Sequence, residues 1–135
     1  MRQRKRAIFT EEVKPAGGRP YSPAIQCGDF LFISGQVPID GKGQTVGRGD
    51  IMAQARQALH NMKALVEAAG GTMDDIAFLS LYVTDMRHYP TFGEIRREFF
   101  REPFPASTII GVTGLANQDW LIEVEGIAYL PQGKG

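Results

Sequence analysis

From Asp50 to Gly71 the chain reads DIMAQARQALHNMKALVEAAGG, which is its clearest helix pattern. The apolar residues recur three and four positions apart, as on one face of an amphipathic helix. They are Ile51, Ala55, Ala58, Leu59, Met62, Leu65, Val66 and Ala69. Asp50 is a favourable N-cap, and the pair Gly70-Gly71 is typical of a helix end. The polar residues Gln54, Gln57, Asn61 and Lys63 are expected largely to fill the other faces.

The segment after this helix predicts a strand whose two faces are both apolar. Between Ile76 and Thr84, the side chains of Leu79, Leu81 and Val83 alternate with those of Phe78, Ser80 and Tyr82. Bulky groups on both faces indicate that both faces are covered. We expect helices to cover one face and another subunit to cover the other.

The remaining pattern predicts further strands and a second helix. Gly28-Asp29 lies between two apolar runs and indicates a β-hairpin. The predicted strands are 6–10, 24–27, 30–34, 107–112 and 120–130, with a flexible loop at 38–49. A second helix is expected to be capped by Thr91 and to run to Phe100, with Arg96 and Arg97 turned outward.

This order of elements predicts an α+β fold in a single domain spanning residues 1–135. Two helices would lie on one face of a mixed sheet, and assembly would bury the other face. Residues 1–6 and 131–135 are expected to be flexible. The basic segment Arg2–Arg6 is interpreted as a solvated N-terminus, because Glu11 and Glu12 soon follow it.

Composition excludes several classes of function. Lys plus Arg and Asp plus Glu each number 15, so no net field attracts nucleic acid or an anionic membrane. No apolar run approaches the roughly 20 residues of a membrane span, and no signal-peptide pattern is found. Cys27 is the single cysteine and is expected to be a buried, inert thiol. We therefore expect a cytoplasmic protein without a metal or cofactor.

Four segments resemble the motifs of the RidA family, also called YjgF, and occur in the family's order. They are RPYSPA at 19–24, SGQVP at 34–38, FPASTII at 104–110 and IEVE at 122–125, and the resemblance extends from about Tyr21 to Ala128. It implies a chorismate-mutase-like fold that forms a homotrimeric barrel, with sheets inside and helices outside. It also implies ligand pockets between neighbouring subunits and the hydrolysis of reactive imines and enamines.

The resemblance assigns catalytic roles to Glu123 and Tyr21. Glu123 aligns with a carboxylate thought to position or activate water, and Tyr21 aligns with a tyrosine that reaches over the pocket. Glu123 and Glu125 are two residues apart on a strand and therefore share a face, so periodicity does not choose between them. The alternatives are a solvent-facing carboxylate at Glu123 and a packed loop aromatic at Tyr21.

The candidate substrate-binding positions are Arg19, Ser34, Gly35, Gly93, Ser107, Thr108 and Ile109. For Ser34 the alternative is a strand-end hydroxyl that already has a partner. Ser107 and Thr108 could hold a neutral polar group, with the backbone N–H of Ile109 as a further donor.

Three of these positions depart from the family's pattern, and one of them is Arg19, which replaces a glycine common in the family. Active deaminases carry an arginine where this chain has Ser107, and usually an asparagine where it has Gly93. Losing a charged hydrogen bond to a substrate carboxylate typically costs about 2–5 kcal/mol. We therefore expect an altered specificity, for a substrate without the usual carboxylate, unless another arginine supplies a replacement cation. Helix periodicity places Arg96 and Arg97 away from the apolar face and favours a surface role for both. Arg19, next to Tyr21, is therefore the better candidate.

These observations predict a homotrimeric hydrolase or deaminase that acts on a small imine, enamine or related nitrogenous metabolite. The alternative is a trimer that binds a small metabolite without chemistry, as a sensor or scavenger. An RNA-cleaving inhibitor of translation is the third possibility, and the zero net charge and the lack of a histidine pair disfavour it.

Overall fold

The computed structural model describes residues 4–14 and 18–131. Its strands are β1 Arg6–Ile8, β2 Ala24–Cys27, β3 Phe30–Gln36, β4 Ile76–Val83, β5 Ala106–Gly111 and β6 Ile122–Tyr129. The helices are α1 Ile51–Ala68 and α2 Phe92–Phe99, with short 3-10 helices at Met73–Asp75 and Met86–Thr91. The six strands form one sheet in the order β1-β2-β3-β6-β4-β5, in which only the β4–β5 pair is parallel. The predicted α+β fold with a mixed sheet is confirmed.

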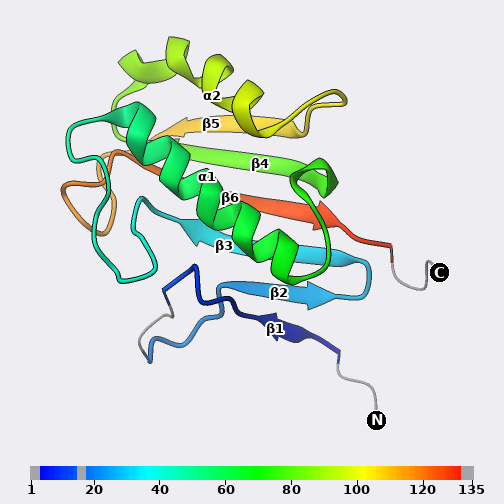
Figure 1. Cartoon of the computed structure of the whole chain (residues 1–135). Helices are drawn as coiled ribbons and strands as arrows, with labels where there is room; N and C mark the ends of the chain where they lie inside the picture. Colours follow the sequence, from blue (N-terminus) through cyan, green and yellow to red (C-terminus); the bar gives the residue numbers. More distant parts are fainter. Residues whose placement is uncertain (1–3, 15–17, 132–135) are drawn as a thin grey trace.

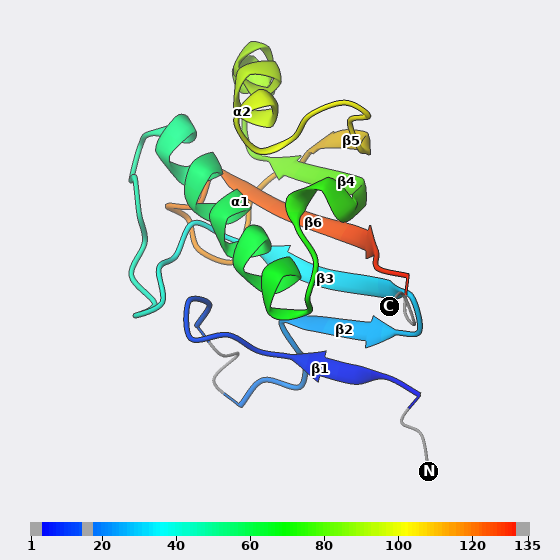
Figure 2. The same ribbon diagram turned by 45° about the vertical axis from the view of Figure 1, so that its right-hand side comes forward.

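Both helices lie on one side of the sheet, as predicted. α1 crosses the face of the sheet, and α2 runs beside the β5 edge (Figure 1, Figure 2). Leu59, Met62 and Leu65 of α1 are fully buried, as are Leu31 of β3 and Leu79 of β4. Burying a side chain of this size stabilises the fold by roughly 1.5–3 kcal/mol, so this layer is its main source of stability.

The other face of the sheet is apolar and open in the single chain. Phe30 and Phe32 alternate with buried Leu31, so they point away from the helices, and each is 46% exposed. Their partners across β3 and β6 are Tyr129 and Ile127, and the Phe30 and Tyr129 rings lie 5.4 Å apart. We call this side of the sheet the open face.

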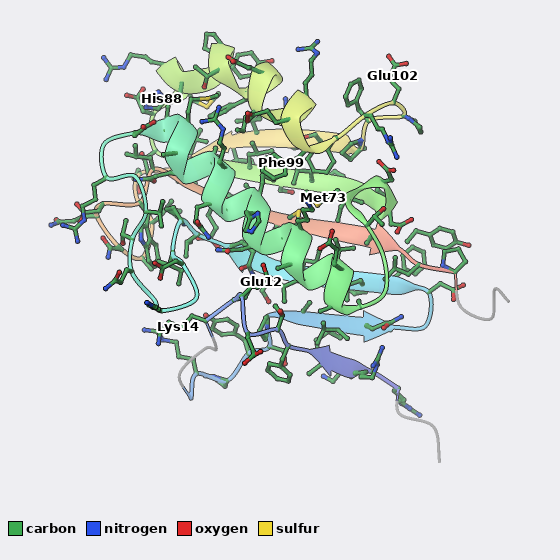
Figure 3. All side chains as sticks on the ribbon, viewed as in Figure 1. Glu12, Lys14, Met73, His88, Phe99 and Glu102 are labelled. Carbon is green, nitrogen blue, oxygen red and sulfur yellow. The ribbon has the colours of Figure 1, made fainter. Side chains whose placement is uncertain are left out.

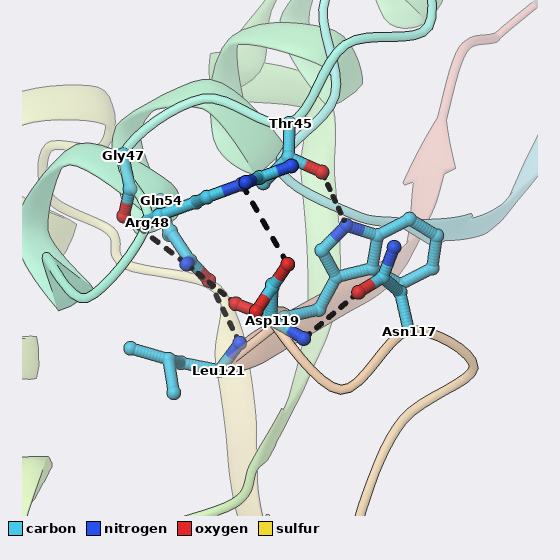
Figure 4. A network of polar contacts seen from close by, with 8 residues as sticks. Thr45, Gly47, Arg48, Gln54, Asn117, Asp119 and Leu121 are labelled. Carbon is cyan, nitrogen blue, oxygen red and sulfur yellow. Dashed lines mark hydrogen bonds and ion pairs between the residues drawn. The ribbon is translucent and has the colours of Figure 1, made fainter.

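Two polar residues of α1 are not on its solvent-facing side, and the prediction for Gln54 and Asn61 was wrong. Gln54 is fully buried and Asn61 is 2% exposed. The Gln54 amide donates to the carbonyls of Gly47 and Asp119, at 3.1 and 2.9 Å, and accepts from the Leu121 N–H at 2.7 Å (Figure 4). The Asn61 amide donates to the carbonyls of the 37–39 segment. Buried polar groups need such partners, and these bonds attach two loops to the helix.

The ends of the chain and of α2 differ from expectation in small ways. Arg6, at the end of the segment expected to be flexible, belongs to β1 and pairs with Gln26 of β2. Residues 1–3 and 132–135 lie outside the described residues.

Thr91 precedes α2 but does not cap it, because its hydroxyl donates to the carbonyl of His88 at 2.7 Å. A 3-10 helix leads directly into α2, so no separate cap is needed.

Candidate functional site

A hollow of about 580 Å³ lies where β3 and β6 meet three loops. Its lining residues are Lys14, Arg19, Tyr21, Gly35, Val37, Ile39, Gly43, Ala116, Asn117, Trp120 and Glu123. Four of the predicted site residues, Arg19, Tyr21, Gly35 and Glu123, therefore line the same hollow.

Glu123 projects from β6 towards Gly35 of β3. A Cβ atom at position 35 would overlap the Glu123 carboxylate, so the glycine provides the space that this carboxylate occupies. The register of β3 against β6 shifts between Ile33 and Gln36, which places Gly35 in the irregular segment. Glu123 is half-buried, and this burial, followed by the nearby charge of Glu125, raises the pKa of its carboxyl. A carboxyl with a raised pKa exchanges protons more readily near neutral pH.

Glu125 shares the face of Glu123, as the spacing requires, but has different surroundings. Its carboxylate accepts a hydrogen bond from the Tyr82 hydroxyl at 2.6 Å, which raises the pKa of Tyr82. It also borders a second hollow of about 350 Å³ on the open face. Among the residues that the structure describes, no side-chain or backbone donor is bonded to Glu123. Of the two carboxylates, therefore, only that of Glu125 accepts a hydrogen bond from the described part of the chain.

Tyr21 and Arg19 stand at the mouth of the first hollow. Tyr21 is 55% exposed, so its ring is not packed into the loop that carries it. Ser34 holds that loop in place, because its hydroxyl donates to the carbonyl of Ser22 at 2.6 Å. Ser34 thus has the partner that the alternative prediction gave it, and it borders the second hollow.

Sequence reasoning missed three polar or aromatic residues of the hollow. Lys14 follows β1, and its side chain packs beside Gly43 (Figure 3). Trp120 is fixed by a hydrogen bond from its indole N–H to the Thr45 hydroxyl at 3.1 Å, and Asn117 precedes it in the same loop (Figure 4). The single tryptophan in the chain was an available signal for this loop, whereas an isolated loop lysine gives none.

The β5 candidates form a separate group. Ser107 pairs with Leu79 of β4, whereas Glu123 pairs with Tyr82 at another level of the same strand. Ser107 and Ile109 take the α2 side of the sheet, and Thr108 takes the open face. Together with Gly93 on α2 they lie apart from the hollow, with β4 between β5 and β6. One chain therefore presents two partial groups of candidate residues.

Arg96 is not turned outward, and this prediction was wrong. Its guanidinium Nη2 donates to the Ser107 hydroxyl at 2.9 Å, and the side chain is half-buried. Burial lowers the pKa of Arg96 from its usual value. The neighbouring Arg97 is exposed, as predicted. Helix periodicity places Arg96 off the apolar stripe of α2, but β5 runs close enough for a long side chain to reach it.

Other candidate sites are weaker. In residues 4–14 and 18–131 no three His, Cys, Asp or Glu side chains are grouped as metal ligands. No helix of the described segments is both long and apolar enough to cross a membrane. Cys27 is half-buried rather than fully buried, because it alternates with Gln26 and so lies on the open face.

The fold and this site together define a class: small α+β proteins with helices on one face of a mixed sheet, and a carboxylate beside a strand glycine at the sheet's end. A family model described as Endoribonuclease L-PSP matches residues 11–130. The chain belongs to this family, that of the RidA/YjgF proteins.

Relatives and solved structures agree with this assignment over almost the whole chain. A RutC family protein of Pyrococcus horikoshii is 46% identical, covering 93% of this chain and 98% of the relative. A 2-iminobutanoate/2-iminopropanoate deaminase of Dermatophagoides farinae is 32% identical, with 91% and 95% covered. The crystal structure of the Escherichia coli YjgF gene product matches with a TM-score of 0.82 and 38% identity, covering 92% of this chain and 98% of that one.

Proposed function

We propose that this protein is a homotrimeric deaminase that hydrolyses small reactive imines or enamines. The observation that carries the proposal is the Glu123 carboxyl, which is half-buried in the hollow beside Gly35 with a raised pKa. No hydrogen bond within the described segments occupies it, so it is free to hold a water molecule. The similarity to a relative named as an iminobutanoate and iminopropanoate deaminase supports the same reaction class.

The reaction needs one residue that moves protons. The reacting form is the iminium, whose nitrogen is already protonated. Ionised Glu123 takes a proton from water as the water oxygen attacks the C=N carbon, which gives a carbinolamine and protonated Glu123. Glu123 then returns this proton to the nitrogen. The C–N bond breaks as the carbinolamine hydroxyl gives its proton to the departing ammonia, so a carbonyl compound and an ammonium ion leave and Glu123 is ionised again. An enamine first takes a proton from the solvent on carbon, which gives the same iminium. Tyr21, at the mouth of the hollow, closes over the substrate.

The proposed trimer explains why the candidate residues fall into two groups. The open face exposes Phe30, Phe32 and Tyr129, and large exposed apolar patches are characteristic of interfaces. Three copies that bury this face would place the β5 edge of one subunit, with Ser107 and Thr108, against the hollow of the next. Arg19, Ser34 and Gly35 would then line or support one side of the substrate, and Gly93, Ser107, Thr108 and the Ile109 amide the other.

The proposal is tested by ammonia release from imines generated in situ by an amino-acid oxidase. Glu123→Gln should remove turnover while the oligomer keeps its mass in light scattering. Glu125→Gln is the matched control, because its amide oxygen still accepts from Tyr82 and turnover should persist. Full activity of Glu123→Gln contradicts the mechanism.

Two other outcomes have a defined meaning. A wild-type oligomer that binds these metabolites but releases no ammonia would be the sensor or scavenger. Cleavage of RNA that disappears in Glu123→Gln, and that weakens with added salt, would support the ribonuclease named in the family's description.

A further inference from the structure

Arg96 is a half-buried cation whose charge is not matched within the part of the chain that the structure describes. Its Nη2 donates to the Ser107 hydroxyl, and its Nε is buried with no hydrogen-bond partner. No carboxylate of the described residues lies within ion-pair distance of it. By contrast, carboxylates pair with Arg48, Arg56, Arg87 and Arg101.

This arrangement is physically costly unless an anion completes it. Burial of a charge without a counter-charge is unfavourable, and here it already lowers the pKa of the guanidinium. Arginine presents five N–H donors in a planar fork, and Ser107 accepts from only one of them. A carboxylate, which accepts two parallel hydrogen bonds, has the charge and shape that the remaining donors require.

The position of this cation makes it accessible to a small ligand. Ser107 and Thr108 are exposed at the beginning of β5, and so are Glu102, Pro103 and Phe104 just before it. The Arg96–Ser107 bond therefore lies at the sheet edge and not in the core. The serine is small enough to leave space for the long side chain that arrives from α2.

We infer that Arg96 binds the carboxylate of the substrate, with Ser107 orienting its guanidinium. This inference rests on the proposed function and adds a specificity-determining residue to it: Arg96 of α2 supplies the positive charge that Ser107 lacks. It replaces the expectation, drawn from Ser107 alone, that the substrate lacks a carboxylate. It also assigns the cation to α2 and not to Arg19.

Binding of pyruvate and of its neutral amide, measured by calorimetry on the intact oligomer, tests the inference without requiring turnover. Arg96→Gln should weaken pyruvate binding by at least about 30-fold, the lower end for a lost charged hydrogen bond, while binding of the amide changes little. Arg97→Gln is the matched control. It removes an equal charge from the next position on α2, where the side chain bonds only to the carbonyl of Gly93, and both ligands should bind as in wild type.

Several results would overturn the inference. They are unchanged pyruvate binding in Arg96→Gln, an equal loss for pyruvate and the amide, or dissociation of the oligomer in that variant. Loss of pyruvate selectivity in Arg19→Ala alone would place the cation at Arg19 instead. Wild-type protein that binds pyruvate through Arg96 but releases no ammonia would leave the carboxylate site standing and remove the deaminase proposal.

Discussion

Gly35 is the residue on which the position of the Glu123 carboxylate depends. Its backbone does not require glycine, but a Cβ there would overlap the carboxylate, which is the mobile end of its side chain. Gly35→Ala should therefore displace the carboxylate with little loss of stability. A misplacement near 1 Å typically costs about 100-fold in rate, and we expect kcat/KM to fall by about that factor.

Steady-state ammonia release measures the expected fall in kcat/KM, and thermal unfolding measures the stability, which should change little. Gly114→Ala is the control, because nothing lies within 4 Å of a Cβ at that position. A Gly35→Ala variant with normal kcat/KM would show that turnover does not depend on the position of the Glu123 carboxylate beside Gly35.

Glu123 should also give the protein a defined pH dependence. Its pKa in the folded state is raised above 4.5 by burial and then by Glu125, so folding favours the protonated carboxyl. This contribution to the unfolding free energy is fully present below pH 4.5 and is lost as the pH rises through the raised pKa. The difference in unfolding free energy between wild type and Glu123→Gln should therefore fall with rising pH across that window.

Chemical denaturation at a series of pH values and one protein concentration measures this difference. Over the same window kcat/KM should rise with pH, because only the ionised Glu123 carboxylate can take a proton from the attacking water. A stability difference that grows with pH would mean that the pKa of Glu123 is lowered and not raised.

For single residues, the sequence predicted the face of an element on which a side chain lies better than it predicted the contacts of that side chain. Strand periodicity correctly placed Glu123 and Glu125 on one face. The structure distinguishes them, because Glu125 accepts a hydrogen bond from Tyr82 whereas Glu123 lies beside Gly35 in the first hollow. Helix periodicity described α2 in isolation, so it did not show that Arg96 reaches a serine eleven residues further along the chain. Contacts between elements depend on packing, which a local pattern does not contain.

Gln54 is one of two α1 residues that hold loops around the hollow, and Asn61, which bonds to the 37–39 segment, is the other. Gln54→Ala would leave the carbonyls of Gly47 and Asp119 and the N–H of Leu121 without their partner. Each buried unsatisfied group costs about 1–3 kcal/mol, and partial access of water reduces the sum, so we expect a loss of about 2–4 kcal/mol.

Urea denaturation measures this loss, and Lys63→Ala, on the exposed side of α1, should change stability by less than about 0.5 kcal/mol. Since Asn117 and Trp120 belong to the loop that Gln54 holds, KM should rise as well. Equal stability of the two variants would show that the loops are held by other contacts.

The elements themselves follow from local chemistry, whereas their arrangement does not. The α1 stripe is a direct helix signal, the Asp50 side chain caps that helix by accepting from the Ala53 N–H, and Gly28 adopts a positive φ of 57° in the β2–β3 turn. The insertion of β6 between β3 and β4 joins segments far apart in sequence. No turn residue or periodicity specifies such a pairing, and the strand order was not predicted from the sequence.

At the scale of the whole molecule, the division of the candidate residues between the hollow and the β5 edge makes one more prediction. If each site combines Glu123 of one subunit with Arg96 of the next, Glu123→Gln and Arg96→Gln remove different halves of it. Mixed oligomers formed from the two impaired variants would then contain some sites with both wild-type residues. For random exchange of equal amounts in a cyclic assembly, about a quarter of the sites would be intact.

Subunit exchange under mild denaturant, followed by ammonia release from 2-iminopropanoate, measures this recovery. Each variant refolded alone is the control and should keep its own low rate when the substrate is well below KM. If Glu123 and Arg96 served one site within the same chain, every chain in the mixture would lack one of them, and activity would not return. Recovery near a quarter of the wild-type rate would therefore establish that the site is shared between subunits, which is the property that links the open apolar face to the chemistry.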